Sequence, residues 1–359
     1  MVAAKQLYRN PPTLRGWSVP AAEKERCRRT NTIYRASTDF GGGCFEKCPV
    51  CYLGNMAVKK PTTSVPIKTA RKMVDQSVSC GAEAISLSGD EPLHYPRFRE
   101  IVSYISSLGK IPLIFTSGTQ KMTDELAIFL FENNATMIVK RNSYDDAALQ
   151  DSMLGWKGAA GRKLSRIENT ISRLMGAGFN KSEPTRLAIE TVMGTANILQ
   201  LPALFRFARK NNIYPFFELI VPAQYVDKKL MLDRNEAKKA FVELLKIDQE
   251  EFGHTWVPRP PHVAAGCDYF HSAIYIRSDE KVQLCPSTNI VVGDLKAESL
   301  VDILGKESTM QLRNIAENVE GNCMKCSYHV DLGCYGCRGR AFYETKNHNA
   351  PDPICWMGG

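Results

Sequence analysis

The sequence predicts an α/β protein in which a partial barrel of six β/α units is followed by a small, cysteine-rich α+β domain. From residue 33 to about 221, short β-rich runs alternate with amphipathic helical patterns. Such alternation indicates a parallel sheet with right-handed crossovers, and six units are too few to close an eight-stranded barrel. Beyond residue 263, seven of the twelve cysteines gather where little helical pattern remains, which indicates a domain organised around metal.

The strands of the barrel are expected in six short runs that are rich in β-branched and aromatic residues. These runs are Ile33–Ala36, Ala84–Leu87, Ile111–Thr116, Thr136–Lys140, Arg186–Val192 and Tyr214–Ile220. Three apolar stripes with helical spacing lie between them, and each stripe ends at a glycine, Gly81, Gly109 or Gly176. A glycine just after the last periodic residue is a typical helix stop.

The boundary of the barrel is expected near residue 263. Asp233 and Glu236 have the spacing of a capping box that opens a helix through about Lys246. A proline-rich stretch, Trp256–Val263, follows it and reads as a linker. The sequence therefore predicts four segments, which are a basic N-terminal extension (1–32), the barrel (33–232), a helix with a linker (233–263) and the cysteine-rich domain (264–359).

The composition is that of an ordinary globular protein, with 359 residues, 44% of them hydrophobic and 23% charged. No apolar run reaches the ~18 residues of a membrane-spanning helix, and the first residues lack the apolar stretch of a secretory signal. A cytoplasmic location without membrane association is therefore expected. Thiols are mostly reduced there, so clustered cysteines suggest metal binding rather than disulfides.

The formal net charge of +8 is concentrated near the start of the chain, where residues 1–32 hold seven Lys and Arg against two Glu. This stretch is either a solvated basic face or a docking surface for an acidic peptide or a nucleic acid. No zinc-finger spacing and no RNA-binding aromatic motif accompanies it. The sequence therefore disfavours a nucleic-acid partner.

The first cysteine group follows the first expected strand directly. Cys44, Cys48 and Cys51 are spaced by three and two residues, and the glycine run 41–43 precedes them. Three thiols from one loop can converge on one metal centre, and a [4Fe–4S] cluster takes four thiolates, so here one iron would stay open for a ligand. Zinc would need a fourth protein ligand, and no histidine lies close in sequence. A chance group of structural thiols is the remaining alternative.

This C-x3-C-x2-C loop after the first strand of a partial barrel resembles that of the radical S-adenosylmethionine (radical SAM) superfamily. Tyr52 matches the aromatic residue that the family places beside the last cysteine, near the adenine of S-adenosylmethionine (AdoMet). The resemblance implies that Cys44, Cys48 and Cys51 hold a [4Fe–4S] cluster whose open iron chelates AdoMet. Reductive cleavage would then yield a 5′-deoxyadenosyl radical that removes a hydrogen atom from a substrate carbon. The enzyme would be oxygen-sensitive, with a flavodoxin- or ferredoxin-type electron donor.

A second match closes the second expected strand. The run Ser88, Gly89, Asp90, Glu91 and Pro92 is similar to the family's Gly-Gly-Glu-Pro motif, with an aspartate at the second glycine. That resemblance implies binding of the methionine amino end of AdoMet. A plain turn punctuated by glycine and proline is the alternative.

The resemblance also suggests further contacts at the barrel mouth. Lys140 and Asn142, at the end of the fourth strand, correspond to the region that contacts the ribose and carboxylate of AdoMet. Glu190, on the next strand, should point into the same mouth, although both positions could hold simple rim charges. Glu190, Glu218 and His94 are the candidate general bases, among which sequence cannot choose because a base is identified by reach.

The seven C-terminal cysteines resemble those of the SPASM domain, which carries two auxiliary [4Fe–4S] clusters in many radical SAM enzymes. By that resemblance, Cys267, Cys285 and Cys337 hold an inner cluster, and an outer cluster is held by Cys323, Cys326, Cys334 and Cys355. Three [4Fe–4S] clusters are thus expected in all. The inner cluster is one ligand short and is expected to keep an open or substrate-bound iron, or else to take His262. Glu280 stands where the family often has glycine, and two zinc sites are the alternative reading.

Three functions compete. The first is oxidation, epimerisation or rearrangement of a small polar natural-product or cofactor precursor. The second is maturation of a ribosomally made peptide, although only about 32 residues precede the first strand, too few for the leader-binding module of many such enzymes. The third, a non-enzymatic iron–sulfur electron carrier, leaves the AdoMet-type motif unexplained. The first is the expected function.

Overall fold

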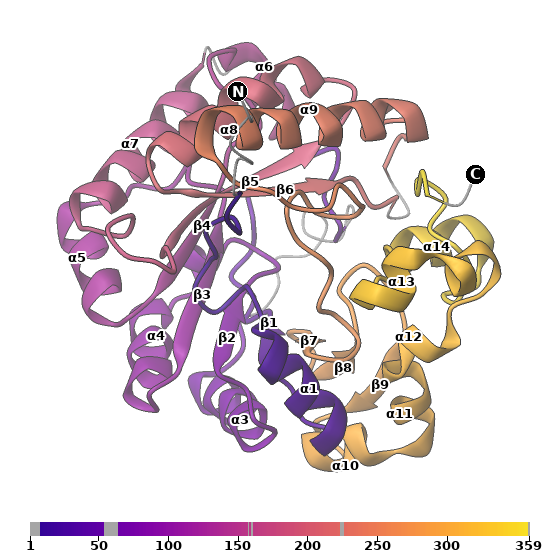
Figure 1. Cartoon of the computed structure of the whole chain (residues 1–359). Helices are drawn as coiled ribbons and strands as arrows, with labels where there is room; N and C mark the ends of the chain where they lie inside the picture. Colours follow the sequence, from indigo (N-terminus) through magenta and orange to yellow (C-terminus); the bar gives the residue numbers. More distant parts are fainter. Residues whose placement is uncertain (1–7, 54–63, 157, 159–160, 223–225, 358–359) are drawn as a thin grey trace.

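The computed structural model describes residues 8–53, 64–156, 158, 161–222 and 226–357, and its centre is a nine-stranded sheet in the order β6-β5-β4-β3-β2-β1-β7-β8-β9 (Figure 1). Neighbouring strands are parallel from β6 to β7 and antiparallel from β7 to β9. The strands are β1 (Arg35–Thr38), β2 (Ala84–Leu87), β3 (Ile111–Thr116), β4 (Thr136–Lys140), β5 (Leu187–Met193), β6 (Tyr214–Leu219), β7 (Ala273–Ile276), β8 (Lys281–Gln283) and β9 (Val291–Asp294).

Helices cover the outer face of the curved parallel sheet, as Figure 1 shows. Those of the barrel are α3 (Ile67–Ser79), α4 (Phe98–Ser107), α5 (Asp124–Glu132), α6 (Ala147–Met153), α7 (Arg162–Gly176), α8 (Leu201–Lys210) and α9 (Arg234–Phe252). The N-terminal helix is α1 (Ala21–Thr30), and the C-terminal helices are α10 (Leu300–Gly305), α11 (Glu307–Arg313), α12 (Ile315–Asn318), α13 (Ser327–Leu332) and α14 (Arg338–Thr345). The predicted partial α/β barrel is confirmed. No helix in the described ranges combines the length and apolar character needed to span a bilayer.

Most predicted elements lie where the sequence indicated, with small corrections at their ends. β1 begins at Arg35 instead of Ile33, and β5 at Leu187 instead of Arg186. The capping box of Asp233 and Glu236 opens α9 as predicted, but the helix runs on to Phe252 because its stop is Gly253, whose backbone is left-handed with φ 70°.

The sheet does not end where the predicted barrel segment ends. β7, from the cysteine-rich region, pairs in parallel with β1, and Arg35 lies opposite Ala273. A seventh parallel strand is thus added at the edge that six β/α units leave open. β8 and β9 continue the sheet, so the C-terminal region and the barrel share one sheet.

The N-terminal stretch fills the inside of the barrel as well as carrying positive charge. Leu14 and Trp17 are buried among inward-facing side chains of β3 to β6. The Trp17 ring packs edge-on against Phe115 and Phe216 at centroid distances of 5.7 and 4.6 Å. The buried guanidinium of Arg35 lies 3.8 Å from the Trp17 ring centroid and donates a 2.7 Å hydrogen bond to the Trp17 carbonyl oxygen. The interior is therefore closed by packed side chains at this level, and the open mouth lies at the opposite, carboxyl ends of the strands.

Candidate functional site

The first cysteine group lies in a glycine-rich loop at the carboxyl end of β1. Gly41, Gly42 and Gly43 have φ values of 71°, 115° and 80°, a left-handed backbone that glycine adopts without strain. A Cβ on Gly42 would also lie 3.0 Å from backbone atoms of His94. Glycine is therefore required at position 42, so that the loop can pack against the backbone at His94.

The three thiols of this loop are close enough to affect one another electrostatically. Burial raises the pKa of Cys44 and of Cys48 to about 12; Cys51 adds to both shifts, and Cys44 adds to that of Cys48. All twelve cysteines lie in the described part of the chain, and none forms a disulfide. Thiols held this way would gain from a cation that stabilises their thiolates, so the loop fits a metal cluster.

Glu46, between the first two cysteines, anchors the loop from within. Its buried carboxylate accepts hydrogen bonds from Thr119 Oγ1 at 2.6 Å and from Trp156 Nε1 at 2.7 Å, and Lys163 Nζ lies 2.8 Å away. The cysteine loop is thereby held to the end of β3 and to the α6–α7 region. Sequence reasoning missed this residue, because a charged residue between cysteines gives no sign of being buried.

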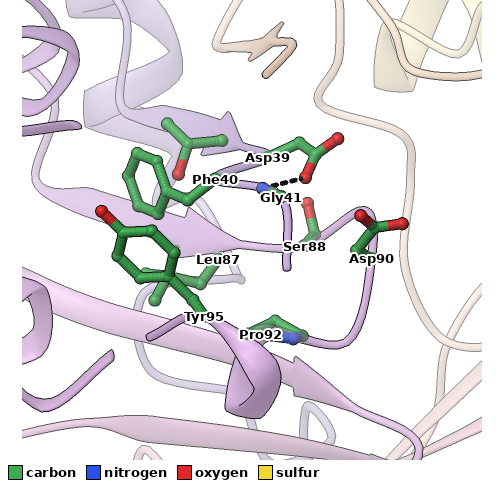
Figure 2. Close-up of a pocket in the computed structure, with 9 residues that line it drawn as sticks. Asp39, Phe40, Gly41, Leu87, Ser88, Asp90, Pro92 and Tyr95 are labelled. Atoms are coloured by element: carbon green, nitrogen blue, oxygen red, sulfur yellow. Dashed lines mark hydrogen bonds between the residues drawn. The ribbon is translucent and has the colours of Figure 1, made fainter. Parts of the chain in front are cut away.

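The run Ser88–Pro92 packs directly against the cysteine loop (Figure 2). The Gly43 backbone N–H donates to Asp90 Oδ2 at 3.0 Å, and Gly41 N–H donates to Asp39 Oδ1 at 2.9 Å. Gly89 has φ 105°, and a Cβ there would lie 2.6 Å from Asp39 Cγ. Asp90, which replaces the family's second glycine, therefore holds the loop by its carboxylate.

Asp39 and Asp90 line a small pocket between these motifs. Figure 2 shows Asp39, Ser88 and Asp90 around it, with Tyr95 and Pro92 on the opposite side. Burial, and then the charge of Asp90, raise the pKa of Asp39 to about 6. An ammonium group near this pocket would relieve the repulsion between the carboxylates.

Glu91 turns the other way and binds β3. Its carboxylate accepts from Thr116 Oγ1 and from Ser117 N–H, each at 2.8 Å. His94 lies against the cysteine loop, since its Nδ1 is 3.0 Å from the Gly43 carbonyl oxygen and its ring contacts Phe45. Glu91 thus anchors its segment to β3, and His94 packs against the cysteine loop.

The barrel mouth brings together Lys140, Glu190 and Glu218 from three neighbouring strands. Lys140 Nζ lies 3.1 Å from Glu190 Oε1, as the pairing of these residues between β4 and β5 requires. Burial, and then the charge of Glu190, raise the pKa of Glu218 to about 8. The charge of Lys140 also acts on Cys48, so this acid pair lies on the side of the barrel that faces the cysteine loop.

Tyr52 has a residue of this region among its electrostatic neighbours, and Asn142 follows the end of β4. Burial raises the pKa of Tyr52, and its electrostatic neighbours include Tyr269 and Glu190. Asn142 is fully buried, its Oδ1 accepts from Val192 N–H at 3.0 Å, and its Nδ2 has no hydrogen-bond partner among the described residues. Asn142 thus links the end of β4 to β5 by a hydrogen bond, and its Nδ2 donor has no partner among the described residues.

His262 reaches the same mouth from the proline-rich linker. Its Nδ1 lies 3.9 Å from Glu218 Oε2, and its ring packs against Phe216 and Trp17. Burial lowers the pKa of His262 to about 4, so the ring is neutral at pH 7. The His262 side chain therefore lies inside the barrel, beside Glu218 and Phe216.

Electrostatic effects link C-terminal thiols within each of the two sets that the resemblance implies. Burial raises the pKa of Cys267, Cys285 and Cys337, the charge of Cys337 adds to the shift of Cys267, and both add to that of Cys285. Cys323 is affected in the same way by Cys326 and Cys334, and Cys355 by Cys323 and Cys334. Across the described residues, no set of three His, Cys, Asp or Glu converges on a position for a single metal ion.

A buried ion pair joins these two groups to the barrel. Arg340 and Asp352 have no exposed side-chain surface, and Arg340 Nη2 lies 2.7 Å from Asp352 Oδ2. Asp352 also accepts a hydrogen bond from the Cys337 N–H at 2.8 Å. Arg340 Nη1 lies 3.4 Å from the carbonyl oxygens of Leu219 and Ile220 at the end of β6.

Glu280 stands at the position where SPASM domains often have glycine. Its backbone is left-handed, with φ 69°, a conformation that glycine adopts without strain, and this explains the preference.

The chain is similar to known proteins in sequence and in fold. No family model matches the chain. It is 23% identical to an AdoMet-dependent heme synthase of Methanosarcina barkeri, over 91% of this chain and 97% of that protein. It is 21% identical to an AdoMet-dependent heme synthase of Oleidesulfovibrio alaskensis, over 80% of this chain and 78% of that protein.

Solved structures with the same fold include SuiB of Streptococcus suis bound to S-adenosylmethionine, with a TM-score of 0.69, 16% identity, and 93% and 80% of the two chains covered. The structure of anSMEcpe with bound AdoMet matches with a TM-score of 0.64, 14% identity, and 91% and 93% covered. The chain thus has the fold of these AdoMet-bound proteins and is similar over most of its length to AdoMet-dependent heme synthases, which agrees with the resemblance of its cysteine motifs to the radical SAM superfamily.

Proposed function

We propose that the chain uses AdoMet to oxidise or otherwise rearrange a small polar precursor of a cofactor or natural product. The observation that carries this proposal is the barrel mouth, where Lys140, Glu190 and Glu218 face the side of the cysteine loop. Such a set can hold a polar substrate and take up a proton. The name of the relatives, AdoMet-dependent heme synthase, supports a cofactor precursor as the substrate class.

In this proposal Cys44, Cys48 and Cys51 hold one [4Fe–4S] cluster, and the two C-terminal thiol groups hold one each. The cluster and AdoMet would supply the radical that removes a substrate hydrogen atom. The pocket of Asp39, Ser88 and Asp90 suits the amino end of AdoMet, because burial and the charge of Asp90 raise the pKa of Asp39 there, and an ammonium group would oppose that shift. Tyr52 and the unused Nδ2 of Asn142 are the further proposed contacts.

The inner group of three thiols would leave one cluster position without a protein ligand. His262 lies inside the barrel, with its Nδ1 3.9 Å from Glu218 Oε2. This geometry supports a fourth position open to substrate over one filled by His262. The segment bounds 33–232 and 264–359 are likewise proposed as the radical and auxiliary-cluster domains.

Anaerobic turnover with candidate substrates tests the proposal. The protein, reconstituted with iron and sulfide, is given AdoMet, a reductant and either a panel of cofactor precursors or a precursor peptide, and 5′-deoxyadenosine is measured against product. We expect product from a small polar substrate, with 5′-deoxyadenosine in proportion. Turnover of peptide alone would replace the proposed substrate class by peptide maturation.

Glu218 is the proposed proton acceptor, and its pKa of about 8 predicts the pH dependence of product formation. The residue faces Lys140, Glu190, His262 and Arg340. Because its carboxyl is protonated below pH 8, product formation should rise between pH 7 and 9 as the base becomes available. Glu218→Gln should lose this rise and lower product formation by about 100-fold or more.

The ratio of product to 5′-deoxyadenosine shows whether Glu218 acts after hydrogen abstraction. We expect Glu218→Gln to keep forming 5′-deoxyadenosine while product falls. Glu243→Gln, an exposed glutamate on α9, is the matched control and should behave as the wild type does. A wild-type pH profile retained by Glu218→Gln would assign the base elsewhere.

A further inference from the structure

Arg35 is a buried cation inside the barrel that has no acidic partner among the described residues. Its side chain, on β1, has no exposed surface. Nη1 donates a hydrogen bond to the Trp17 carbonyl oxygen, whereas Nε and Nη2 have no hydrogen-bond partner in the described part of the chain. Arg209 and Arg340 are also buried, but each is paired with an aspartate. Because a buried charge is normally compensated by an opposite one, an anionic group is expected beside Arg35.

The rings that adjoin this guanidinium do not supply the negative charge. Its Cζ lies 3.8 Å from the Trp17 ring centroid and 5.6 Å from the Tyr269 ring centroid. Burial raises the pKa of Tyr269 to about 12. Burial, followed by the charges of Arg340 and Arg35, lowers the pKa of His262 to about 4. Tyr269 and His262 are therefore both neutral at pH 7.

The segment that carries Cys267, a member of the inner thiol group, lies next to Arg35. The Tyr269 hydroxyl is 2.8 Å from Ser37 Oγ on β1, and the Tyr269 backbone N–H donates to the Cys267 thiol. Tyr335 Oη donates to the Tyr269 carbonyl oxygen at 2.9 Å. Burial raises the pKa of Cys267 to about 12, and the charge of Arg35 opposes this shift. Tyr269 thus holds the cysteine segment against β1, on which Arg35 lies.

We propose that Arg35 sets the reduction potential of the inner cluster, because its buried charge stabilises the reduced, more negative state of that cluster. The inference rests on the proposed function for the presence of the cluster. The unpartnered donors fit such a group, since a cluster held by thiolates is anionic, and its potential depends on nearby charge and on hydrogen bonds to its sulfur atoms. Arg35 therefore raises the potential and makes the inner cluster a better electron acceptor.

A redox titration of the full-length, cluster-loaded protein, followed by electron paramagnetic resonance, tests this inference. The signal that Cys285→Ala removes identifies the inner cluster, and its midpoint potential is compared between the wild type and the Arg35 variants. Arg35→Gln and Arg35→Met both remove the charge, so one can be measured if the other does not fold. Arg35→Lys keeps the charge but loses the planar guanidinium.

Arg186→Gln is the matched control. It also removes a buried guanidinium that stacks on an aromatic ring, since Arg186 is 8% exposed and lies 4.3 Å from the Phe131 ring centroid. Arg186 directly precedes β5 and packs against α5, and it donates to the Phe131 carbonyl oxygen at 2.8 Å. The control therefore reproduces the loss of buried cation–ring packing at a different strand of the sheet.

We expect the inner-cluster potential to fall by at least about 59 mV in Arg35→Gln and Arg35→Met, which is a tenfold change in the ratio of reduced to oxidised cluster for one electron. Arg35→Lys and Arg186→Gln should stay close to the wild type. The difference should persist at high salt, because a buried charge is screened little. Loss of folded protein would weaken the signal without moving its midpoint.

Two results would overturn the inference, and a third would reach further. An unchanged potential in the variants without the charge would show that Arg35 does not act on the cluster. An equal fall in Arg35→Lys or Arg186→Gln would assign the effect to packing. A wild type without any signal that depends on Cys285 would refute the inner cluster of the proposed function, and this inference would fall with it.

Discussion

Replacing Cys44, Cys48 or Cys51 by alanine is expected to abolish 5′-deoxyadenosine formation from AdoMet, to the background of the assay. The three thiols come from one loop, act on one another electrostatically and have no neighbouring cysteine to replace a lost member. A cluster with three protein ligands has none to spare. Product formation depends on the radical and should disappear with it.

Iron content and a matched cysteine variant separate this effect from misfolding. Each loop variant should lose roughly one third of the iron, the share of one of the three proposed [4Fe–4S] clusters. Cys80→Ala serves as the control, because Cys80 is a buried thiol at the end of α3, outside all three groups, and packs as a small apolar residue. It should keep full iron and full cleavage. AdoMet cleavage retained by a loop variant would refute the assignment of this cluster.

Replacing Asp352 by alanine is expected to lower the free energy of unfolding by about 3–5 kcal/mol, the usual cost of leaving one partner of a buried ion pair uncompensated. Asp352 neutralises the buried Arg340 and accepts the Cys337 N–H. Although burial opposes it, the charge of Arg340 lowers the pKa of Asp352. A carboxyl group whose pKa is lowered by folding stabilises the folded state at pH values above the ordinary pKa of aspartate, and this stabilisation is lost only on acidification. The full effect of the substitution is therefore expected at neutral pH.

The second consequence of this substitution concerns the thiol groups. Cys337 belongs to the inner group and Cys355 to the outer one, and Asp352 acts on both. Asp352→Ala should therefore reduce the iron of both C-terminal sites, whereas AdoMet cleavage by the first cluster persists in the folded fraction. Urea unfolding and iron analysis measure the two effects. Glu251→Gln, at the exposed pair with Arg206, should change stability by less than about 1 kcal/mol, and an equally small change for Asp352→Ala would contradict the role given to the buried pair.

Local sequence patterns were sufficient for much of the barrel. β2, β3 and β4 lie at their predicted residues because each is a short apolar run between clear breaks. The helices α5 and α8 were not predicted. In α5 (Asp124–Glu132), apolar side chains surround the helix, with Ile128 and Phe131 exposed opposite buried Ala127 and Leu130, so no single stripe marks it.

Contacts between distant segments could not be read from the sequence. Glu218 has the same local sequence pattern as an exposed glutamate at the barrel rim. Its pKa is raised by burial and then by the charge of Glu190 on the neighbouring strand, and neither can be read from the local sequence. Arg340 and Asp352 become a buried pair only when the C-terminal loops close over the end of β6. The cysteines could be assigned to groups from the sequence alone, because their spacing resembles that of a known family and spacing is visible in the sequence itself.

The pairing of β1 with β7 has a consequence for the order in which the chain is made. β1 is among the first strands to leave the ribosome, yet its second neighbour is not complete until Ile276 has been added. During that interval one side of β1 presents unpaired backbone groups, which invite association with other chains. Shortened versions that stop before β7 would keep this edge permanently, so we expect the parallel strands β1 to β6 to depend on the cysteine-rich region for a covered edge.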